Sequence, residues 1–212
     1  MNLPIPSRES CEARSAGSRT ADHQARRQES VAWAGVRECP LKFRQLVLTA
    51  VREGSGQLVL REIEDRDLGV LFEHSRDRDA IRMAAFTSPE ADDRTSFERR
   101  WERLESDGST TNRVIEIDDR VVGHIASFDL EGHGEVTYWI GREDWGRGIA
   151  TRALQEFLQL EATRPLYAHA ASDNAASIRV LTKCGFLIVG EGRGFAHGRN
   201  EETDEVVLRL DP

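Results

Sequence analysis

The chain has 212 residues, of which 39% are hydrophobic and 31% charged, values typical of one globular domain with a sizeable core. No apolar run approaches the roughly 18 residues of a membrane-spanning helix. The three cysteines are too scattered to form a metal knuckle or a redox pair. We therefore expect a cytoplasmic protein that has no membrane contact and no metal site.

The charge is unevenly distributed along the chain. Residues 1–56 hold nine Lys or Arg against six Asp or Glu, whereas residues 57–212 hold 20 against 31, so a net charge of −8 divides into +3 and −11. An acidic domain is poorly suited to the phosphate backbone of nucleic acids, and it attracts cationic or amine-bearing partners. We expect no nucleic-acid partner.

The two parts also differ in their patterning. Residues 1–56 show little sustained periodicity, which predicts a disordered or loosely helical extension, or a leader upstream of the true start of translation. Residues 57–212 alternate apolar and polar positions throughout and are expected to form the folded domain.

The domain is expected to begin with a strand and two helices. The strand covers Leu58–Ile63, and Asp65 caps the helix that follows it. The second helix is predicted where Phe97, Trp101 and Leu104 recur at i, i+4 and i+7.

The remaining elements alternate more regularly. Asp118-Asp119 is expected to join two strands in a tight hairpin, and Gly132 to Gly134 to turn the chain into the next strand. In chain order the expected elements are the strands Arg113–Ile117, Arg120–Phe128 and Glu135–Ile140, a helix Gly148–Glu161, a strand Leu166–Ala170, a helix Asn174–Cys184, and the strands Phe186–Val189 and Val206–Leu210, separated by a glycine-rich loop Gly190–Arg199.

This order predicts an α/β (α+β) fold. Consecutive hairpins imply antiparallel pairing, while the strand–helix–strand crossover after Ile140 implies at least one parallel pair. We expect a mixed, mostly antiparallel sheet of six or seven strands with helices on both faces.

A glycine-containing turn precedes the helix that starts at Gly148. Small residues at Gly146, Gly148 and Ala150 leave room for a ligand to approach the backbone, and the first N–H groups of the helix point toward it. A pyrophosphate suits this geometry, with Arg147 as a flexible cationic clamp. The alternative is a tight turn whose small residues serve only helix–sheet packing.

Two other phosphate motifs fit the turn poorly. Thr151 stands where a dinucleotide-binding fingerprint needs Gly or Ala, and the Gly-Lys-Ser/Thr of a P-loop is absent.

A second pattern runs from Asn174 to Phe186. Asn174 and Ser177, at the start of a helix, are by themselves also explained as an N-cap and an exposed polar residue. Gly148-Ile149-Ala150 match the last three places of the motif Gln/Arg-x-x-Gly-x-Gly/Ala, and Asn174, Ser177 and Gly185-Phe186 match Asn-x-x-Ser followed by a helix and Gly-Phe. With both motifs in this order, the chain resembles the GNAT superfamily of acetyl-CoA-dependent N-acetyltransferases.

The resemblance covers roughly Gln57 to Leu210 and is greatest with the branch that includes ribosomal-protein N-terminal (alanine) acetyltransferases. In that branch Trp is familiar at the first motif place, where Trp145 stands here instead of Gln or Arg. The resemblance implies a splayed central strand pair and acetyl-CoA as co-substrate. The cofactor-binding residues that it implies are Tyr138, Trp139, Ile140, Trp145, Gly146, Arg147, Gly148, Ile149, Ala150, Thr151, Asn174 and Ser177.

The sequence identifies the general base and the general acid less clearly than the cofactor-binding residues. Glu135 is the candidate general base, acting through water, although a solvated strand residue is an equal alternative. His124 and His169 are interpreted as packed or exposed residues. Many relatives have a tyrosine general acid where this chain has Leu181, so that role does not carry over.

The acceptor is expected to be a primary amine of a small molecule or of a protein N-terminus. Its recognition is assigned to Arg82–Pro89, the Phe97–Leu104 helix and Arg193–Asn200, which have no framework role. The alternative function is a catalytically inactive acyl-CoA-binding regulatory module. A homodimer is common among relatives and is kept as a further expectation.

Overall fold

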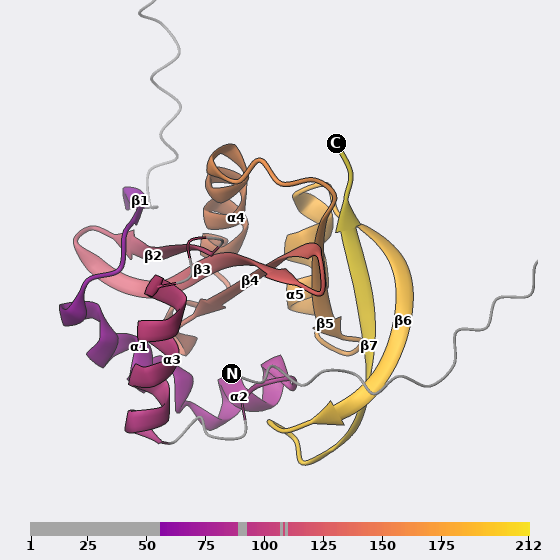
Figure 1. Ribbon diagram of the computed structural model, residues 1–212, viewed down its shortest axis with the longest axis horizontal. Coiled ribbons are helices and arrows are strands. Elements are labelled where there is room, and N and C mark those ends of the chain that lie inside the picture. Colours follow the sequence, from indigo (N-terminus) through magenta and orange to yellow (C-terminus); the bar gives the residue numbers. More distant parts are fainter. Residues whose placement is uncertain (1–55, 89–92, 107, 109) are drawn as a thin grey trace, which may run out of the picture. The chain divides into compact units, whose positions relative to one another are not determined.

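A computed structural model describes residues 56–88, 93–106, 108 and 110–212 (Figure 1). The expectations about residues 1–55 lie outside this range. In chain order the elements are β1 Leu58–Arg61, the 3-10 helix η1 Asp65–Asp67, α1 Leu68–Ser75, α2 Arg78–Ala84, α3 Arg94–Ser106, β2 Thr111–Ile117, β3 Arg120–Leu130, β4 His133–Ile140, the 3-10 helix η2 Arg142–Asp144, α4 Ile149–Leu160, β5 Leu166–Ala171, α5 Ala175–Lys183, β6 Leu187–Ala196 and β7 Glu201–Leu210.

The strands form one seven-stranded sheet in the order β1-β2-β3-β4-β5-β7-β6. Every neighbouring pair is antiparallel except β4 and β5, which are joined through α4. The predicted mixed, mostly antiparallel sheet is therefore confirmed. The β2–β3 hairpin turns at Asp118 and Asp119, both in the left-handed region, as that dipeptide predicts.

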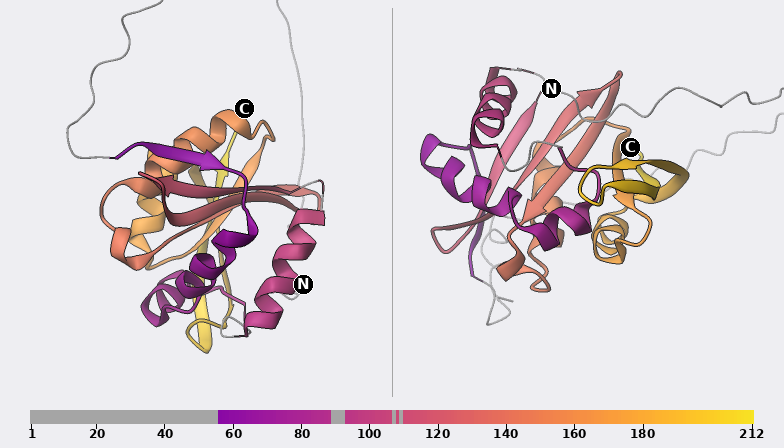
Figure 2. Two further views of the ribbon diagram at one scale, coloured as in Figure 1. Left: turned by 90° about the vertical axis from the view of Figure 1, so that its left-hand side faces the viewer. Right: turned by 90° about the horizontal axis from the view of Figure 1, so that it is seen from below.

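Helices cover both faces of the sheet, with α1, α2 and α3 on one side and α4 and α5 on the other (Figure 2). The side chains of each strand alternate between these two faces. We call them the α1–α3 face and the α4–α5 face.

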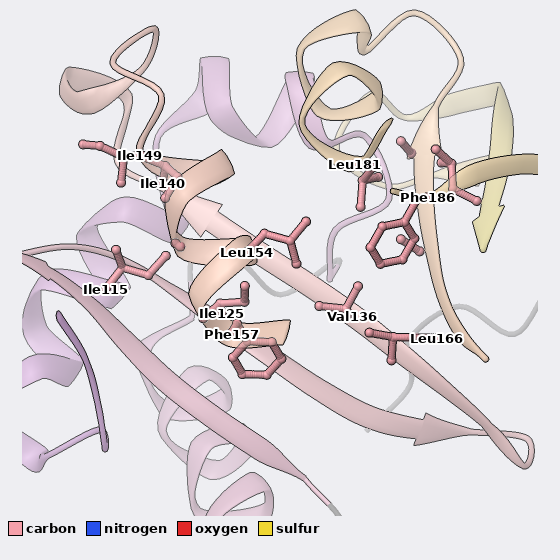
Figure 3. Packing of buried hydrophobic residues seen from close by; sticks show 14 of the residues in the cluster. Ile115, Ile125, Val136, Ile140, Ile149, Leu154, Phe157, Leu166, Leu181 and Phe186 are labelled. Atoms are coloured by element: carbon pink, nitrogen blue, oxygen red, sulfur yellow. The ribbon is translucent and has the colours of Figure 1, made fainter. Parts of the chain in front are cut away.

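The main core lies between the sheet and the helices α4 and α5. Helix α4 contributes Ile149, Ala153, Leu154 and Phe157, spaced so that they share one side of the helix, and Phe157 is completely buried (Figure 3). Fixing α4 against the sheet also fixes the position of the turn that precedes it.

A second cluster lies on the α1–α3 face. Leu71 and Phe72 of α1 pack against Phe97 and Trp101 of α3, and the Phe72 and Phe97 rings meet edge to face at 5.2 Å. The predicted periodicity of α3 is thereby confirmed.

Two predicted boundaries are wrong on the C-terminal side. The glycine-rich loop over Gly190–Arg199 is mostly strand, because β6 runs to Ala196 and pairs with β7 from Glu201 onward. Glycine has low strand propensity, but continuous pairing with a neighbouring strand overrides it.

Three predictions near the start of the domain also need correction. β1 ends at Arg61, two residues before the predicted end. Asp65 does not cap a helix; instead Glu64 precedes η1, and the Asp67 side chain accepts a hydrogen bond from the Glu64 N–H at 2.8 Å. Helix α2 was missed although Asp77 caps it by accepting from the Ala80 N–H, so the predicted recognition loop starts within a helix.

Candidate active site

The sheet opens between its two central parallel strands. β3 and β4 pair over eight positions, whereas β4 pairs with β5 only at Gly134–Leu166 and Glu135–Tyr167. Beyond Glu135 the backbone of β4 has no strand partner on its β5 side in the part of the chain that the structure describes. The N–H and C=O groups of Tyr138 to Ile140 on that edge, apart from the Ile140 carbonyl, are thus available to a ligand.

The glycine turn lies at the end of this opening. Gly146 and Gly148 have φ of 74° and 75°, and Gly148 is the N-cap of α4 without any side-chain cap. A Cβ atom built on either glycine would meet no heavy atom within 4 Å. The two glycines are therefore needed for the backbone conformation of the turn. Helix–sheet packing does not require them, so this part of the structural alternative is excluded for Gly146 and Gly148. An anion can approach the uncapped N–H groups of α4 across this space.

A buried carboxylate anchors the turn. Asp144 is 1% exposed and accepts hydrogen bonds at 2.8 and 2.7 Å from the two guanidinium nitrogens of Arg120 on β3. Arg120, and with a smaller effect Arg147, lowers the pKa of Asp144. Arg147 also pairs with Asp144, so the expected flexible clamp is tethered in this structure. Neither Arg120 nor Asp144 was singled out from the sequence.

Trp145 closes the other side of the turn. Its indole N–H donates to the carbonyl of Ile140 at 2.8 Å, while 39% of the residue stays exposed. The side chain thus links the turn to the last residue of β4. The Ile140 carbonyl is already engaged, which leaves the other backbone groups of β4 for a ligand.

Asn174 and Ser177 hold the start of α5. The Asn174 side chain accepts from the Ser177 N–H at 3.0 Å and donates to the Met83 carbonyl at 3.1 Å, so it caps α5 and ties α2 to it. The Ser177 hydroxyl lies 2.8 Å from that of Tyr138 on β4. Burial raises the pKa of Tyr138 to about 12, so the phenol keeps its proton near neutral pH. The motif therefore joins both sides of the strand opening.

Glu135 lies on the α1–α3 face of β4. It is buried, and its Oε1 forms an ion pair with Nε2 of His169 on β5 at 3.3 Å. The other ring nitrogen of His169 lies 3.4 Å from the carboxylate of Glu205 on β7. The structure thus brings the predicted base together with a histidine that we had interpreted as packed or exposed and with a glutamate that we had not identified.

His124 is a core residue. Its ring packs edge to face on Trp101, and burial lowers its pKa to about 3, so it is neutral near neutral pH. Leu181 lies beside Phe186 in the main core and is 1% exposed (Figure 3). Cys184 is half-buried, and burial raises the pKa of its thiol. None of these three residues offers an accessible proton-transfer group.

Two of the three segments predicted to recognise the acceptor contact each other, while the third, α3, packs on α1. The turn between β6 and β7 contacts the end of α2, where the Gly198 N–H donates to Ala85 and the Arg199 guanidinium donates to Arg82, both at 2.8 Å. Phe86 lies next to Gly194 of β6, since a Cβ on this glycine would come 3.7 Å from its ring. Pro89, the last residue of the predicted loop, lies outside the described residues.

Two hollows lie elsewhere on the molecule. One of about 360 Å³ and one of about 640 Å³ lie beside α1 and share Val70, His74 and Glu143. Neither includes the glycine turn or Glu135. Over the described residues there is no cluster of His, Cys, Asp or Glu that could hold a metal ion and no helix long and apolar enough to cross a membrane.

Several solved structures share this fold. A protein provisionally named phosphinothricin N-acetyltransferase is 25% identical over 73% of this chain and 98% of its own, with a TM-score of 0.62. Spermidine N-acetyltransferase from Vibrio cholerae, solved with CoA and spermine, is 21% identical over 72% and 95%, with a TM-score of 0.61. Ribosomal-protein-alanine N-acetyltransferase from Brucella melitensis is 22% identical over 73% and 99%, with a TM-score of 0.62.

None of the curated proteins matches the chain in sequence. The family model described as "Acetyltransferase (GNAT) domain" matches residues 57–187, well over half of the chain and including both motifs. The chain therefore belongs to the GNAT family of acetyltransferases.

Proposed function

We propose that this protein transfers the acetyl group of acetyl-CoA to a primary amine by direct attack of the neutral amine on the thioester. The observation that carries the proposal is the opening of the sheet beyond Glu135, which ends beside the uncapped helix start at Gly148. An extended thioester arm attached to a pyrophosphate fits these two features together.

The residues around the opening would bind the co-substrate as follows. The amides from Gly148 to Thr151 would hold the pyrophosphate, and the backbone of Tyr138 to Ile140 would hold the pantetheine arm and polarise the thioester carbonyl. Asn174 and Ser177 would border the arm from α5. The open space above Gly146 and Gly148 supports this placement.

Arg147 would change partners when the co-substrate binds. In this structure it pairs with the buried Asp144, but Arg120 bonds both oxygens of the same carboxylate. Arg147 can therefore leave for a phosphate without exposing Asp144 as an unpaired buried charge. Half of its side chain is already exposed.

Glu135 would be the general base. Its carboxylate lies on the α1–α3 face, opposite α4 and α5, and would take the proton of an amine that approaches from this face. Glu135→Gln is expected to lower kcat by about a hundredfold or more, the range of general-base catalysis, with little effect on KM for acetyl-CoA. Glu202→Gln, at an exposed position of β7, is the matched control.

Membership of the family does not specify which class of amine accepts the acetyl group, so the acceptor class is part of this proposal. The likeness to ribosomal-protein alanine acetyltransferases supports a protein N-terminus, while the likeness to spermidine acetyltransferase supports a polyamine. Incubation with acetyl-CoA and a panel of peptides, polyamines and amino sugars, followed by assay of thiol release, separates these classes. Binding of acetyl-CoA without amine-dependent thiol release across the panel would contradict the proposed function. A homodimer stays a prediction, testable by light scattering.

A further inference from the structure

The cluster Glu135, His169 and Glu205 connects three adjacent strands on one face. In the sheet order, β5 lies between β4 and β7, and the side chains at these three positions point away from the core beneath α4 and α5. The His169 side chain is 37% exposed, but those of Glu135 and Glu205 are only 9% and 15% exposed. Two mostly buried carboxylates thus share one imidazole.

We propose that His169 and Glu205 are positioning residues for Glu135: the imidazolium occupies Oε1 of Glu135, Glu205 orients the imidazolium, and Oε2 is left free for the amine. The proposal rests on the proposed function and assigns to it two residues outside the motifs. In the ion pair with His169, the carboxylate of Glu135 uses Oε1 and not Oε2.

The room for this arrangement comes from a glycine on β6. Gly192 pairs with Glu205 across the β6–β7 ladder, and a Cβ on Gly192 would come 2.8 Å from Oε1 of Glu205. Any larger side chain would displace the carboxylate from its place beside His169. The position of the Glu205 carboxylate therefore depends on a glycine that the sequence pattern assigned to a loop.

Among the residues that the structure describes, the charges that act on His169 are those of Glu135 and Glu205. On β7, Arg209 pairs with Asp211 at 2.8 Å. On β6, Arg193 pairs with Asp204 at 3.3 Å, and on α2, Arg82 acts on Asp173. The imidazole thus faces Glu135 from β4 and Glu205 from β7.

The protonation of His169 agrees with this geometry. Glu135, and after it Glu205, raise the pKa of His169 to about 10, against the opposing effect of burial. Both ring nitrogens therefore carry a proton near neutral pH and donate to the two carboxylates. Because the raised pKa belongs to the folded state, the stabilisation is complete below about pH 6.5 and is lost as the pH rises through about 10.

The acceptor amine loses two protons during the reaction. An ammonium proton moves to the free oxygen of Glu135, the neutral nitrogen bonds to the thioester carbon, and the C–S bond breaks. The nitrogen loses a second proton as the amide forms. One proton protonates the thiolate and one passes to water, while His169 stays an imidazolium.

Removing the cation should impair proton transfer from the amine. Without it, the two mostly buried carboxylates of Glu135 and Glu205 face each other with no intervening positive charge. His169→Gln is therefore expected to move the acid limb of the kcat/KM profile upward by about one pH unit and to lower kcat about tenfold. Glu205→Gln should shift the acid limb and lower kcat in the same direction, but by smaller amounts. His169→Arg, which keeps a cation there, should recover most of the loss.

His133→Gln, an exposed histidine at the start of β4, is the matched control and should leave the profile unchanged. An acid limb and kcat of His169→Gln equal to those of the parent would overturn the proposal. A purely structural link between the strands would lower the melting temperature without moving the acid limb.

A readout independent of turnover is the NMR titration of the His169 imidazole in the full chain. We expect a midpoint near 10 in the parent and lower midpoints in Glu135→Gln and Glu205→Gln. A parent midpoint near 6.5 would overturn the proposal even if no amine is acetylated. Conversely, a midpoint near 10 without turnover would contradict the proposed function, but it would still support the pairing of a protonated His169 with Glu135 and Glu205.

Discussion

Gly148→Glu tests the phosphate position at the start of α4. Gly148 has φ of 75°, and an added Cβ would meet no heavy atom within 4 Å, so the fold accommodates the side chain. The left-handed backbone costs a non-glycine residue about 1–2 kcal/mol. A carboxylate at a helix N-terminus recovers about 0.5 kcal/mol of this. The free energy of unfolding should therefore fall by only about 1 kcal/mol.

The effect on binding should be much larger. Two unit charges about 4 Å apart near a protein surface repel by about 4 kcal/mol, which corresponds to about a thousandfold in Kd. Since solvent and side-chain motion relieve part of this, we expect Kd for acetyl-CoA to rise at least about a hundredfold. Isothermal titration calorimetry measures Kd, and a thermal melt reports folding.

Two control variants separate the contributions. Gly148→Gln has similar bulk and the same backbone strain without the charge, so it isolates the steric part. Gly132→Glu places a carboxylate at another open glycine, with φ of 87°, in the turn between β3 and β4. If Gly148→Glu binds acetyl-CoA as tightly as the parent, or Gly132→Glu loses as much affinity, the phosphate assignment is wrong.

Two further predictions concern stability. Because the pKa of His124 falls from 6.5 to about 3 on folding, the protein loses stability as the pH falls through this range, and His124→Phe should remove about 2 kcal/mol of the loss between about pH 7 and pH 5. Urea unfolding at both pH values tests this, and an equal loss in variant and parent would contradict it. Arg120→Ala should lower the free energy of unfolding by about 1–3 kcal/mol, because the buried Asp144 loses two of its hydrogen bonds. Arg193→Ala, in an exposed ion pair, should cost less than about 0.5 kcal/mol, and an equal cost in both variants would refute the anchoring role of Arg120.

The sequence predicts those parts of the fold whose signals are local. The Asp118-Asp119 hairpin, the apolar stripe of α4 and the cap at Asn174 all depend on residues a few positions apart, and all are observed. The one crossover through α4 was enough to predict the parallel pair of β4 and β5.

The parts that were missed depend on distant partners. β6 forms because Gly190 to Gly194 lie against β7, and no local pattern shows that pairing. Arg120 and Asp144 meet from positions 24 residues apart, and Glu135, His169 and Glu205 meet from three separate strands. The predicted last strand began at Val206, one residue after Glu205. Had it been extended toward its N-terminus, the alternation of side chains would have placed Glu205 on the same face as Glu135.

The most direct measurement is a crystal structure of the protein with CoA. We expect the pyrophosphate within hydrogen-bond distance of the amides from Gly148 to Thr151, the pantetheine arm between β4 and β5, and Arg147 turned from Asp144 toward a phosphate. CoA bound in the hollows beside α1, around His74 and Glu143, with the strand opening empty, would contradict it.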